Sequence, residues 1–312
     1  KTIMTSYNSV DGIPSTSNRY LLTDVLRGQW GFDGFVFSDL GSIEGIATSH
    51  RTASSIKEAA SLTLHAGVDV DLGGNAYDRN LEQALAEGLI REEELDSAVS
   101  RVLKLKFEMG LFENPYVDPE KANQIVRNEY HKALAREVAR QGTVLLKNKQ
   151  LLPLSKDVKS IAIVGPNADN IYNQLGDYTA PQERDNIISV LDGIKNAVSK
   201  NIKLHYVKAC AIRDTTQSDI AAAVAAARQS DVVVAVVGGS SARDFKTDYV
   251  GTGAAVVSDK RVDIIPDMES GEGYDRNSLS LLGDQLKLLD ALFGIGKPVV
   301  VVCIQGRPLD MN

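Results

Sequence analysis

The sequence predicts an α/β chain with parallel strands, arranged in two domains. Residues 1–112 contain three units in which a short β-rich run precedes an amphipathic helix. Residues 159–312 contain four continuous apolar runs, as expected for strands buried on both faces, with helical segments between them. Strands that alternate with helices are typical of a parallel sheet, and 312 residues are enough for two hydrophobic cores.

The first domain, residues 1–112, is expected to contain three short strands and four helices. The predicted strands are residues 2–6, 34–39 and 66–72, and the predicted helices are residues 21–30, 56–65, 81–87 and 93–109. Leu21, Val25 and their apolar neighbours have helical spacing. Gly88 and Gly110 stand where a helix ends. Three such units cannot close an eight-fold barrel by themselves.

Residues 113–158 are expected to link the domains. They contain Asn114-Pro115 and Asp118-Pro119 among many polar residues, and a helix is predicted from His131 to about Arg140.

The second domain, residues 159–312, is expected to be an open sheet covered on both faces. Its predicted strands are residues 161–165, 204–207, 232–237 and 299–304, and its predicted helices are residues 188–199, 219–228 and 281–292. One helix between each pair of apolar strands favours a mostly parallel arrangement.

The composition excludes several classes of protein. The 34 basic and 41 acidic side chains give a net charge of −7, so the chain has no excess of positive charge for nucleic acid. No apolar run approaches the length of a membrane-spanning helix. The glycine-rich turns at Gly165 and Gly238 follow buried strands but do not complete a dinucleotide fingerprint.

Metal and thiol chemistry are not expected either. The four histidines are scattered without metal-ligand spacing, and the two cysteines, Cys210 and Cys303, lie in or beside apolar strands. The sequence therefore predicts no metal site and no cofactor.

Asp39 is the first candidate site residue, because it stands at the end of the predicted strand 34–39. Carboxylates at the carboxyl ends of barrel strands usually belong to the site. The alternative is that Asp39 caps the following helix. Tyr7 ends the first strand and either reaches Asp39 or simply packs. Asp69 and Asp71 either line the same edge or brace loops.

Glu272 is the second candidate, in the acid-rich run MESGEGYDR of residues 268–276. The segment 238–277 has no strong periodicity, and long loops of this kind are often functional. A carboxylate between two glycines can extend toward a neighbouring domain. From composition alone, a solvated charged loop is the favoured interpretation.

Several runs together resemble glycoside hydrolase family 3. They include TIMTSYN at 2–8, GFDGFVFSD at 31–39, AGVD at 66–69, TVLLKN at 143–148, IVGPNA at 163–168, GEGYDR at 271–276 and GRPL at 306–309. The resemblance covers essentially the whole chain, and it is closest to bacterial β-glucosidases and β-xylosidases. It implies the C-terminal part of a TIM-like (β/α) barrel, followed by a mostly parallel α/β sandwich domain.

The resemblance also implies a retaining exo-β-glycosidase that releases terminal β-D-glucosyl residues from oligosaccharides or glycosides. Asp39 matches the catalytic nucleophile, Glu272 the general acid/base, and Tyr7 a tyrosine that orients the nucleophile. Such a mechanism needs two carboxyl groups about 5–5.5 Å apart. Leu40 stands where many members have a Trp that stacks on the leaving-group side of the substrate, so the resemblance does not extend to the preference for the leaving group.

Further expectations follow from the same resemblance. The chain is expected to be a fragment that lacks the first part of the barrel and the C-terminal end. Export to the periplasm or the medium is implied, and a homo-oligomer is possible. Three alternatives stay open: a β-xylosidase, a β-N-acetylglucosaminidase of the same family, and a non-catalytic carbohydrate-binding or structural fragment. The Gly-Glu-Gly run around Glu272 disfavours the N-acetylglucosaminidase.

Overall fold

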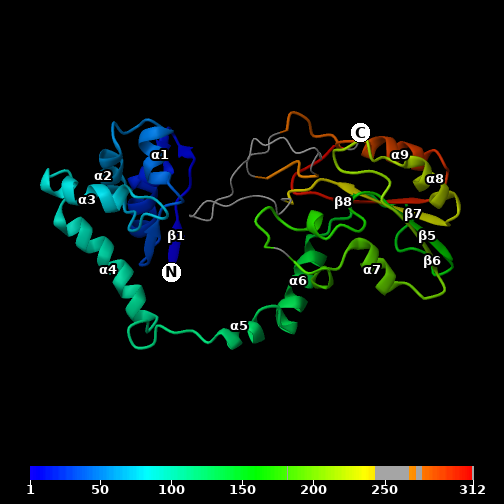
Figure 1. Cartoon of the computed structure of the whole chain (residues 1–312), viewed down its shortest axis with the longest axis horizontal. Coiled ribbons are helices and arrows are strands. Elements are labelled where there is room, and N and C mark those ends of the chain that lie inside the picture. The colour runs from blue at the N-terminus through cyan, green and yellow to red at the C-terminus, as the bar shows by residue number, and fades with distance from the viewer. Residues whose placement is uncertain (181, 243–266, 272–275, 311–312) are drawn as a thin grey trace. The chain divides into compact units, whose positions relative to one another are not determined.

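The computed structural model describes residues 1–180, 182–242, 267–271 and 276–310. These residues form two compact units, one of residues 1–142 and one from residue 143 onward (Figure 1). Each unit combines helices with parallel strands, which confirms the predicted α/β class.

Unit 1 contains short strands and a larger number of helices. Its strands are β1 (Thr2–Met4), β2 (Ser9–Val10), β3 (Ile13–Pro14) and β4 (Phe35–Phe37). Its helices are η1 (Ser15–Ser17), η2 (Tyr20–Gln29), α1 (Ser42–Thr48), α2 (Ile56–Ala66), α3 (Ala76–Ala86), α4 (Glu92–Glu108), α5 (Pro119–Ile125) and α6 (Glu129–Gly142). The β2–β3 hairpin is an addition to the predicted elements, since strands of two residues leave no readable periodicity.

The parallel sheet of unit 1 is centred on β4. β1 pairs with β4 in parallel, with Ile3 opposite Val36, and Phe37 forms a parallel bridge with Val70. The predicted strand 66–72 is therefore wrong in length. Gly67 ends α2 with a φ of +103°, which leaves few residues in which an extended strand could form.

The core of unit 1 lies between β4 and the helices. Val36 is fully buried at its centre, and Ile43 and Ile46 of α1 pack in the same cluster. Helix α3 begins at Ala76 rather than at the predicted residue 81. The carboxylate of Asp71 accepts the backbone N–H of Ala76 at 2.8 Å, which supports a first turn that the apolar pattern does not reveal.

Unit 2 is built around one four-stranded parallel sheet. Its strands are β5 (Ser160–Val164), β6 (Lys203–Val207), β7 (Val232–Gly238) and β8 (Val299–Ile304). Its helices are η3 (Tyr172–Gln174), η4 (Arg184–Asn186), α7 (Val190–Ala197), α8 (Ile220–Arg228) and α9 (Gln285–Phe293). The predicted start of the last helix, residue 281, is wrong, because Gly283 adopts a φ of +61° and lies tightly against the backbone of Ile212.

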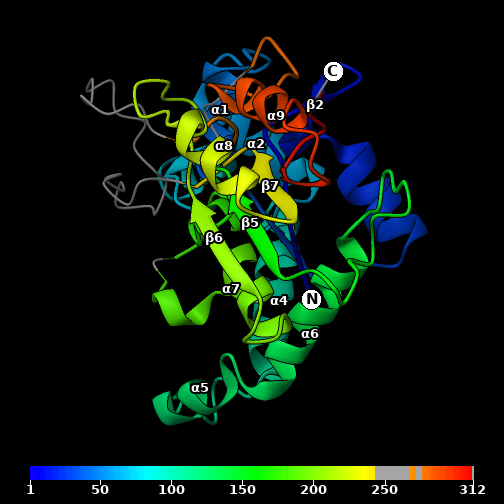
Figure 2. The ribbon, with the colours of Figure 1, turned by 90° about the vertical axis from the view of Figure 1, so that its right-hand side faces the viewer.

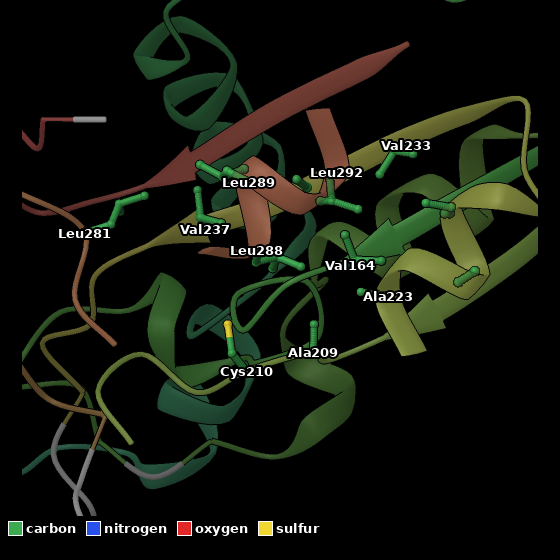
Figure 3. Packing of buried hydrophobic residues seen from close by; sticks show 14 residues of the cluster. Val164, Ala209, Cys210, Ala223, Val233, Val237, Leu281, Leu288, Leu289 and Leu292 are labelled. Atoms are coloured by element: carbon green, nitrogen blue, oxygen red, sulfur yellow. The ribbon is translucent and has the colours of Figure 1, made fainter. Parts of the chain in front are cut away.

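Both faces of this sheet are covered, as predicted. Helices α8 and α9 lie on one face and α7 on the other (Figure 2). Alternate residues of β7 serve the two cores: Val233 and Val237 face α8 and α9, whereas Val234 faces α7. Leu288 and Leu292 of α9 point into the first of these cores (Figure 3).

The strand order of this sheet is β6-β5-β7-β8. The chain starts in the middle at β5, adds β6 on one side, and then adds β7 and β8 on the other. The direction of winding therefore reverses between β5 and β7. In open α/β sheets, ligand-binding loops gather at the carboxyl ends of the strands that flank such a reversal.

Candidate active site

Asp39 and Tyr7 both lie at the carboxyl edge of the sheet in unit 1, where each forms a hydrogen bond with the backbone of Leu40. Asp39 is partly buried, two residues after the end of β4, and its Oδ1 accepts the backbone N–H of Leu40 at 2.7 Å. The hydroxyl of Tyr7, which follows β1, donates to the carbonyl oxygen of Leu40 at 2.8 Å. Both predicted site residues therefore contact Leu40, and the interpretation that Tyr7 merely packs is wrong.

Asp39 does not cap the helix that follows it. The N-cap of α1 is Gly41, whose φ of +64° is left-handed, and no side chain caps this helix. The carbonyl oxygen of Asp39, not its carboxylate, accepts the N–H of Ser42 at 3.1 Å. The capping alternative is thus wrong, and the carboxylate of Asp39 is held only beside the backbone of Leu40 in the described residues.

A chain of buried hydroxyl groups lies beneath these loops. The Oγ1 atoms of Thr5 and Thr16 are 2.9 Å apart, and Thr16 Oγ1 donates to Ser42 Oγ at 3.2 Å. All three residues are at least 95% buried, with 5%, 2% and 4% of their surface exposed. They join the end of β1 to the start of α1, and so fix the two segments that carry Tyr7 and Asp39.

His50 supports the same region from the far end of α1. Its Nε2 donates to the carbonyl oxygen of Tyr7 at 2.8 Å, which fixes the tautomer at that nitrogen. Sequence reasoning missed His50 and Thr16. Neither belongs to a periodic pattern, and each acts across a long separation in the chain, so no local signal marks them.

Asp69 is a buried structural group and does not line the edge. Only 1% of its side chain is exposed, and it forms ion pairs with Arg27 at 2.7 Å and Arg101 at 2.5 Å. Its Oδ2 also accepts the N–H of Val36 at 2.8 Å. Asp69 therefore braces β4 against two helices, as the bracing alternative predicts.

Asp71 lies at the carboxyl edge, but its oxygens are engaged. They accept the N–H groups of Ala76 and Tyr77, at 2.8 and 3.2 Å, in the first turn of α3. Burial raises the pKa of the Asp71 carboxyl, and the nearby negative charge of Glu44 acts in the same direction. Asp71 thus serves α3 rather than an open site.

The carboxyl edge of the sheet in unit 2 is closely packed at the reversal between β5 and β7. Asn167 has no exposed surface and donates its Nδ2 to the carbonyl oxygen of Gly239 at 3.2 Å. A Cβ on Gly165, at a φ of +114°, would lie 2.2 Å from the carbonyl oxygen of Val236. The glycines of these turns are thus explained by close approach of the strand ends.

Glu272 lies outside the described residues, so its predicted place in the site stays a prediction. The residues that precede it are described and are anchored to the end of β7. The N–H of Glu269 donates to the carbonyl oxygen of Ser240 at 2.9 Å, and Arg213 donates to the carbonyl oxygen of Met268 at 2.9 Å. The segment is therefore not a wholly solvated loop, because Met268, Glu269 and Ser270 are all at least 95% buried.

Within the described part of the chain, no group of three His, Cys, Asp or Glu side chains could hold a metal ion. The same residues contain no helix whose length and apolarity would let it cross a membrane. The described geometry offers one candidate for chemistry, the partly exposed carboxylate of Asp39 near the end of β4. Among the described residues, no cationic side chain forms an ion pair with it.

Two family models match the chain. Residues 1–105 match the Glycosyl hydrolase family 3 N terminal domain, and residues 143–312 match the Glycosyl hydrolase family 3 C-terminal domain. A beta-xylosidase of Formosa agariphila is 35% identical over 99% of this chain and 41% of its own length. A periplasmic beta-glucosidase of Salmonella typhimurium is 34% identical over 98% of this chain and 40% of its own length.

Solved structures agree with these likenesses. A beta-glucosidase from Listeria innocua in complex with isofagomine superposes with a TM-score of 0.81 at 32% identity, over 99% of this chain and 39% of that one. The chain thus spans about two fifths of the length of the relatives that it matches.

Proposed function

The chain belongs to glycosyl hydrolase family 3, and we propose that it carries both catalytic carboxylates of a retaining, exo-acting β-glycosidase. The observation that carries the proposal is the arrangement at the carboxyl edge of unit 1. There a partly exposed Asp39 lies two residues after the parallel strand β4, and Tyr7, which follows the neighbouring strand β1, donates a hydrogen bond to the adjoining residue, Leu40. Reactive carboxylates of α/β barrels occupy this kind of position.

In the first proposed step, Asp39 is the nucleophile. Its carboxylate oxygen forms a bond to the anomeric carbon while the bond from that carbon to the leaving oxygen breaks. The carboxyl proton of Glu272 passes to the leaving oxygen, so an alcohol departs and a glycosyl ester of Asp39 remains. Tyr7 and the N–H of Leu40 keep the attacking carboxylate oriented.

In the second proposed step, water releases the sugar. The Glu272 carboxylate takes one proton from water, the water oxygen bonds to the anomeric carbon, and the ester bond to Asp39 breaks. Two inversions give net retention, and both carboxylates return to their starting forms. The two groups must start in different protonation states, so their surroundings must differ.

The proposed substrates are oligosaccharides or glycosides with a terminal β-D-glucosyl residue, with β-xylosides as the second class. Relatives of both names support this choice, since the beta-xylosidase and the periplasmic beta-glucosidase match with nearly equal identity. Leu40 adjoins the nucleophile, and an aliphatic side chain there offers less stacking surface to a leaving sugar than a tryptophan does.

A substrate panel on the complete protein tests the proposed function. Aryl β-glucoside, β-xyloside, β-galactoside and N-acetyl-β-glucosaminide are compared by kcat/KM, and the β-glucoside is expected to be cleaved best. If none of the four is cleaved, the non-catalytic alternative holds instead.

A second test addresses the proposed acid. Glu272→Gln is expected to lose on the order of 10²–10⁴-fold in kcat/KM with a phenyl glycoside and far less with a 2,4-dinitrophenyl glycoside, whose leaving group needs little proton transfer. Glu183→Gln, at an exposed glutamate of the same unit, is the matched control and is expected to behave as wild type. Equal losses with both substrates in Glu272→Gln would remove Glu272 from the proposed role.

We further propose that the complete protein acts in the periplasm or outside the cell. The support is the periplasmic beta-glucosidase of Salmonella typhimurium among its relatives. Cell fractionation with an antibody against the chain tests this, and retention of all antigen in the cytoplasmic fraction would contradict it.

A further inference from the structure

Glu269 and Arg276 form a buried ion pair on either side of the proposed acid. Arg276 Nη1 lies 2.7 Å from Glu269 Oε2, and the two side chains are only 6% and 2% exposed. Glu272 lies three residues after one partner and four residues before the other. The pair therefore joins the two ends of a six-residue stretch, 270–275, that contains Glu272.

Glu269 is set against the end of β7 by close packing. A Cβ on Gly239 would lie 2.0 Å from Glu269 Oε1, so the glutamate occupies the space that any other residue at position 239 would need. The N–H groups of Glu269 and Ser270 both donate to the carbonyl oxygen of Ser240, at 2.9 and 3.3 Å. The carboxylate thus sits on the backbone of the strand end itself.

Arg276 links the far end of the stretch to the rest of unit 2. Its Nη2 donates to the carbonyl oxygen of Ser280, and Ser280 forms a parallel bridge with Asp310. The guanidinium group thereby connects the segment after Glu272 with the segment before it. Two charges buried this deeply are costly to desolvate, and fixing a geometry is one use that such pairs serve.

We propose that the Glu269–Arg276 ion pair positions the general acid/base Glu272 for proton transfer. This inference rests on the proposed function, because it assigns the pair to the acid that the function requires. In this proposal the pair acts through Glu272, as a positioning group, and not on the reacting atoms themselves. The ion pair fixes residues 269 and 276, and this is expected to hold the acid between them in place. Misplacement by about 1 Å can cost ~10²-fold in rate.

The test uses the complete protein and two leaving groups. Glu269→Gln, which keeps the shape but removes the charge, and Arg276→Met are compared with wild type on phenyl and 2,4-dinitrophenyl β-glucosides. We expect kcat/KM to fall about 10–100-fold for the phenyl glycoside and less than about threefold for the dinitrophenyl glycoside. Arg276→Lys, which retains the positive charge, is expected to recover part of the loss.

Asp231→Asn is the matched control for stability. Asp231 accepts the N–H groups of Lys159 and Ser160, both at 2.9 Å, at the amino end of the same sheet and so at the edge opposite Glu269. Its loss is expected to lower the Tm and to reduce activity equally on both substrates. Equal losses in Glu269→Gln or Arg276→Met would mean that the pair only stabilises the fold, and would overturn the proposal.

Glu272→Gln separates the two possible failures. If Glu272→Gln discriminates between the leaving groups and the ion-pair variants do not, the positioning proposal is wrong and the proposed function stands. If Glu272→Gln itself does not discriminate, the assignment of the acid is wrong. Should Arg276→Met not fold, the nearly isosteric Glu269→Gln and the charge-retaining Arg276→Lys supply the same comparison.

Discussion

Each unit contains a carboxylate that stabilises the fold and a carboxylate proposed for catalysis, but the two units arrange these groups differently. In unit 1 the stabilising aspartate and the proposed reactive one lie on different segments: Asp69 is buried between two arginines, whereas Asp39, after β4, is partly exposed beside Leu40. In unit 2 the stabilising glutamate, Glu269, and the proposed acid, Glu272, are three residues apart on one segment. Stability and chemistry are therefore expected to separate on mutation in unit 1 and to be coupled in unit 2.

The largest expected effect is the loss of the nucleophile in unit 1. Asp39→Asn is expected to lower kcat by about 10⁴-fold or more, because an amide cannot form the glycosyl ester. Its Tm is expected to stay close to that of wild type, since an amide oxygen can still accept the N–H of Leu40. Calorimetry and steady-state kinetics on one preparation check both points. A large fall in Tm would remove the separation claimed for unit 1.

The next largest effect is expected from Asp69→Asn in the same unit, which affects stability and not activity. Asp69→Asn leaves Arg27 and Arg101 without their buried counter-charge, and is expected to cost about 3–5 kcal/mol of unfolding free energy. Activity per folded molecule is expected to be unchanged, because Asp69 lies away from the edge. Urea denaturation measures the cost, and active-site titration gives the folded fraction. A reduced kcat per titrated site would contradict this prediction.

A smaller effect with a distinct signature is expected from Gly239→Ala in unit 2. The new Cβ would displace the Glu269 carboxylate, because the position that this Cβ would take lies only 2.0 Å from Glu269 Oε1. Overpacking of this kind costs about 1–3 kcal/mol. Because Glu269 and Glu272 share a segment, the variant is also expected to lose more activity on phenyl than on dinitrophenyl glucosides. A stability loss with no such preference would show that the two properties are separate in unit 2 as well.

The smallest effect is expected at Tyr7. Tyr7→Phe removes the hydroxyl that donates to the Leu40 carbonyl, a hydrogen bond worth about 1 kcal/mol, or roughly fivefold in kcat/KM. The reduction is expected to be similar for both leaving groups, because Tyr7 supports the nucleophile and not the acid. A loss confined to the phenyl glucoside would place Tyr7 with the acid instead.

Much of the fold could be predicted because its signals are local. Continuous apolar runs such as 232–237 mark strands buried on both faces, and they predict the ends of all four strands of unit 2 to within about one residue. The placement of Tyr7 and Asp39 at one edge can also be predicted, since they follow neighbouring parallel strands. Parallel strands bring their carboxyl ends to one edge, so position in the chain predicts proximity.

The rest depends on packing between distant residues. Asp69 and Asp71 are two residues apart, yet one binds two arginines and the other caps a helix, and no sequence pattern distinguishes them. Glu269 was visible only as one acid among several, and its burial depends on the missing side chain of Gly239, thirty positions away. The predicted division into residues 1–112, 113–158 and 159–312 stays a prediction.

The most direct measurement is covalent trapping of the nucleophile in the complete protein. A 2-deoxy-2-fluoro-β-glucosyl fluoride slows release of the glycosyl enzyme, so the sugar ester accumulates and can be located by peptide mass spectrometry. We predict one label, carried as an ester by Asp39 within the peptide that contains GFVFSDLG, residues 34–41. A stable label on any other carboxylate, with Asp39 unmodified, would contradict it.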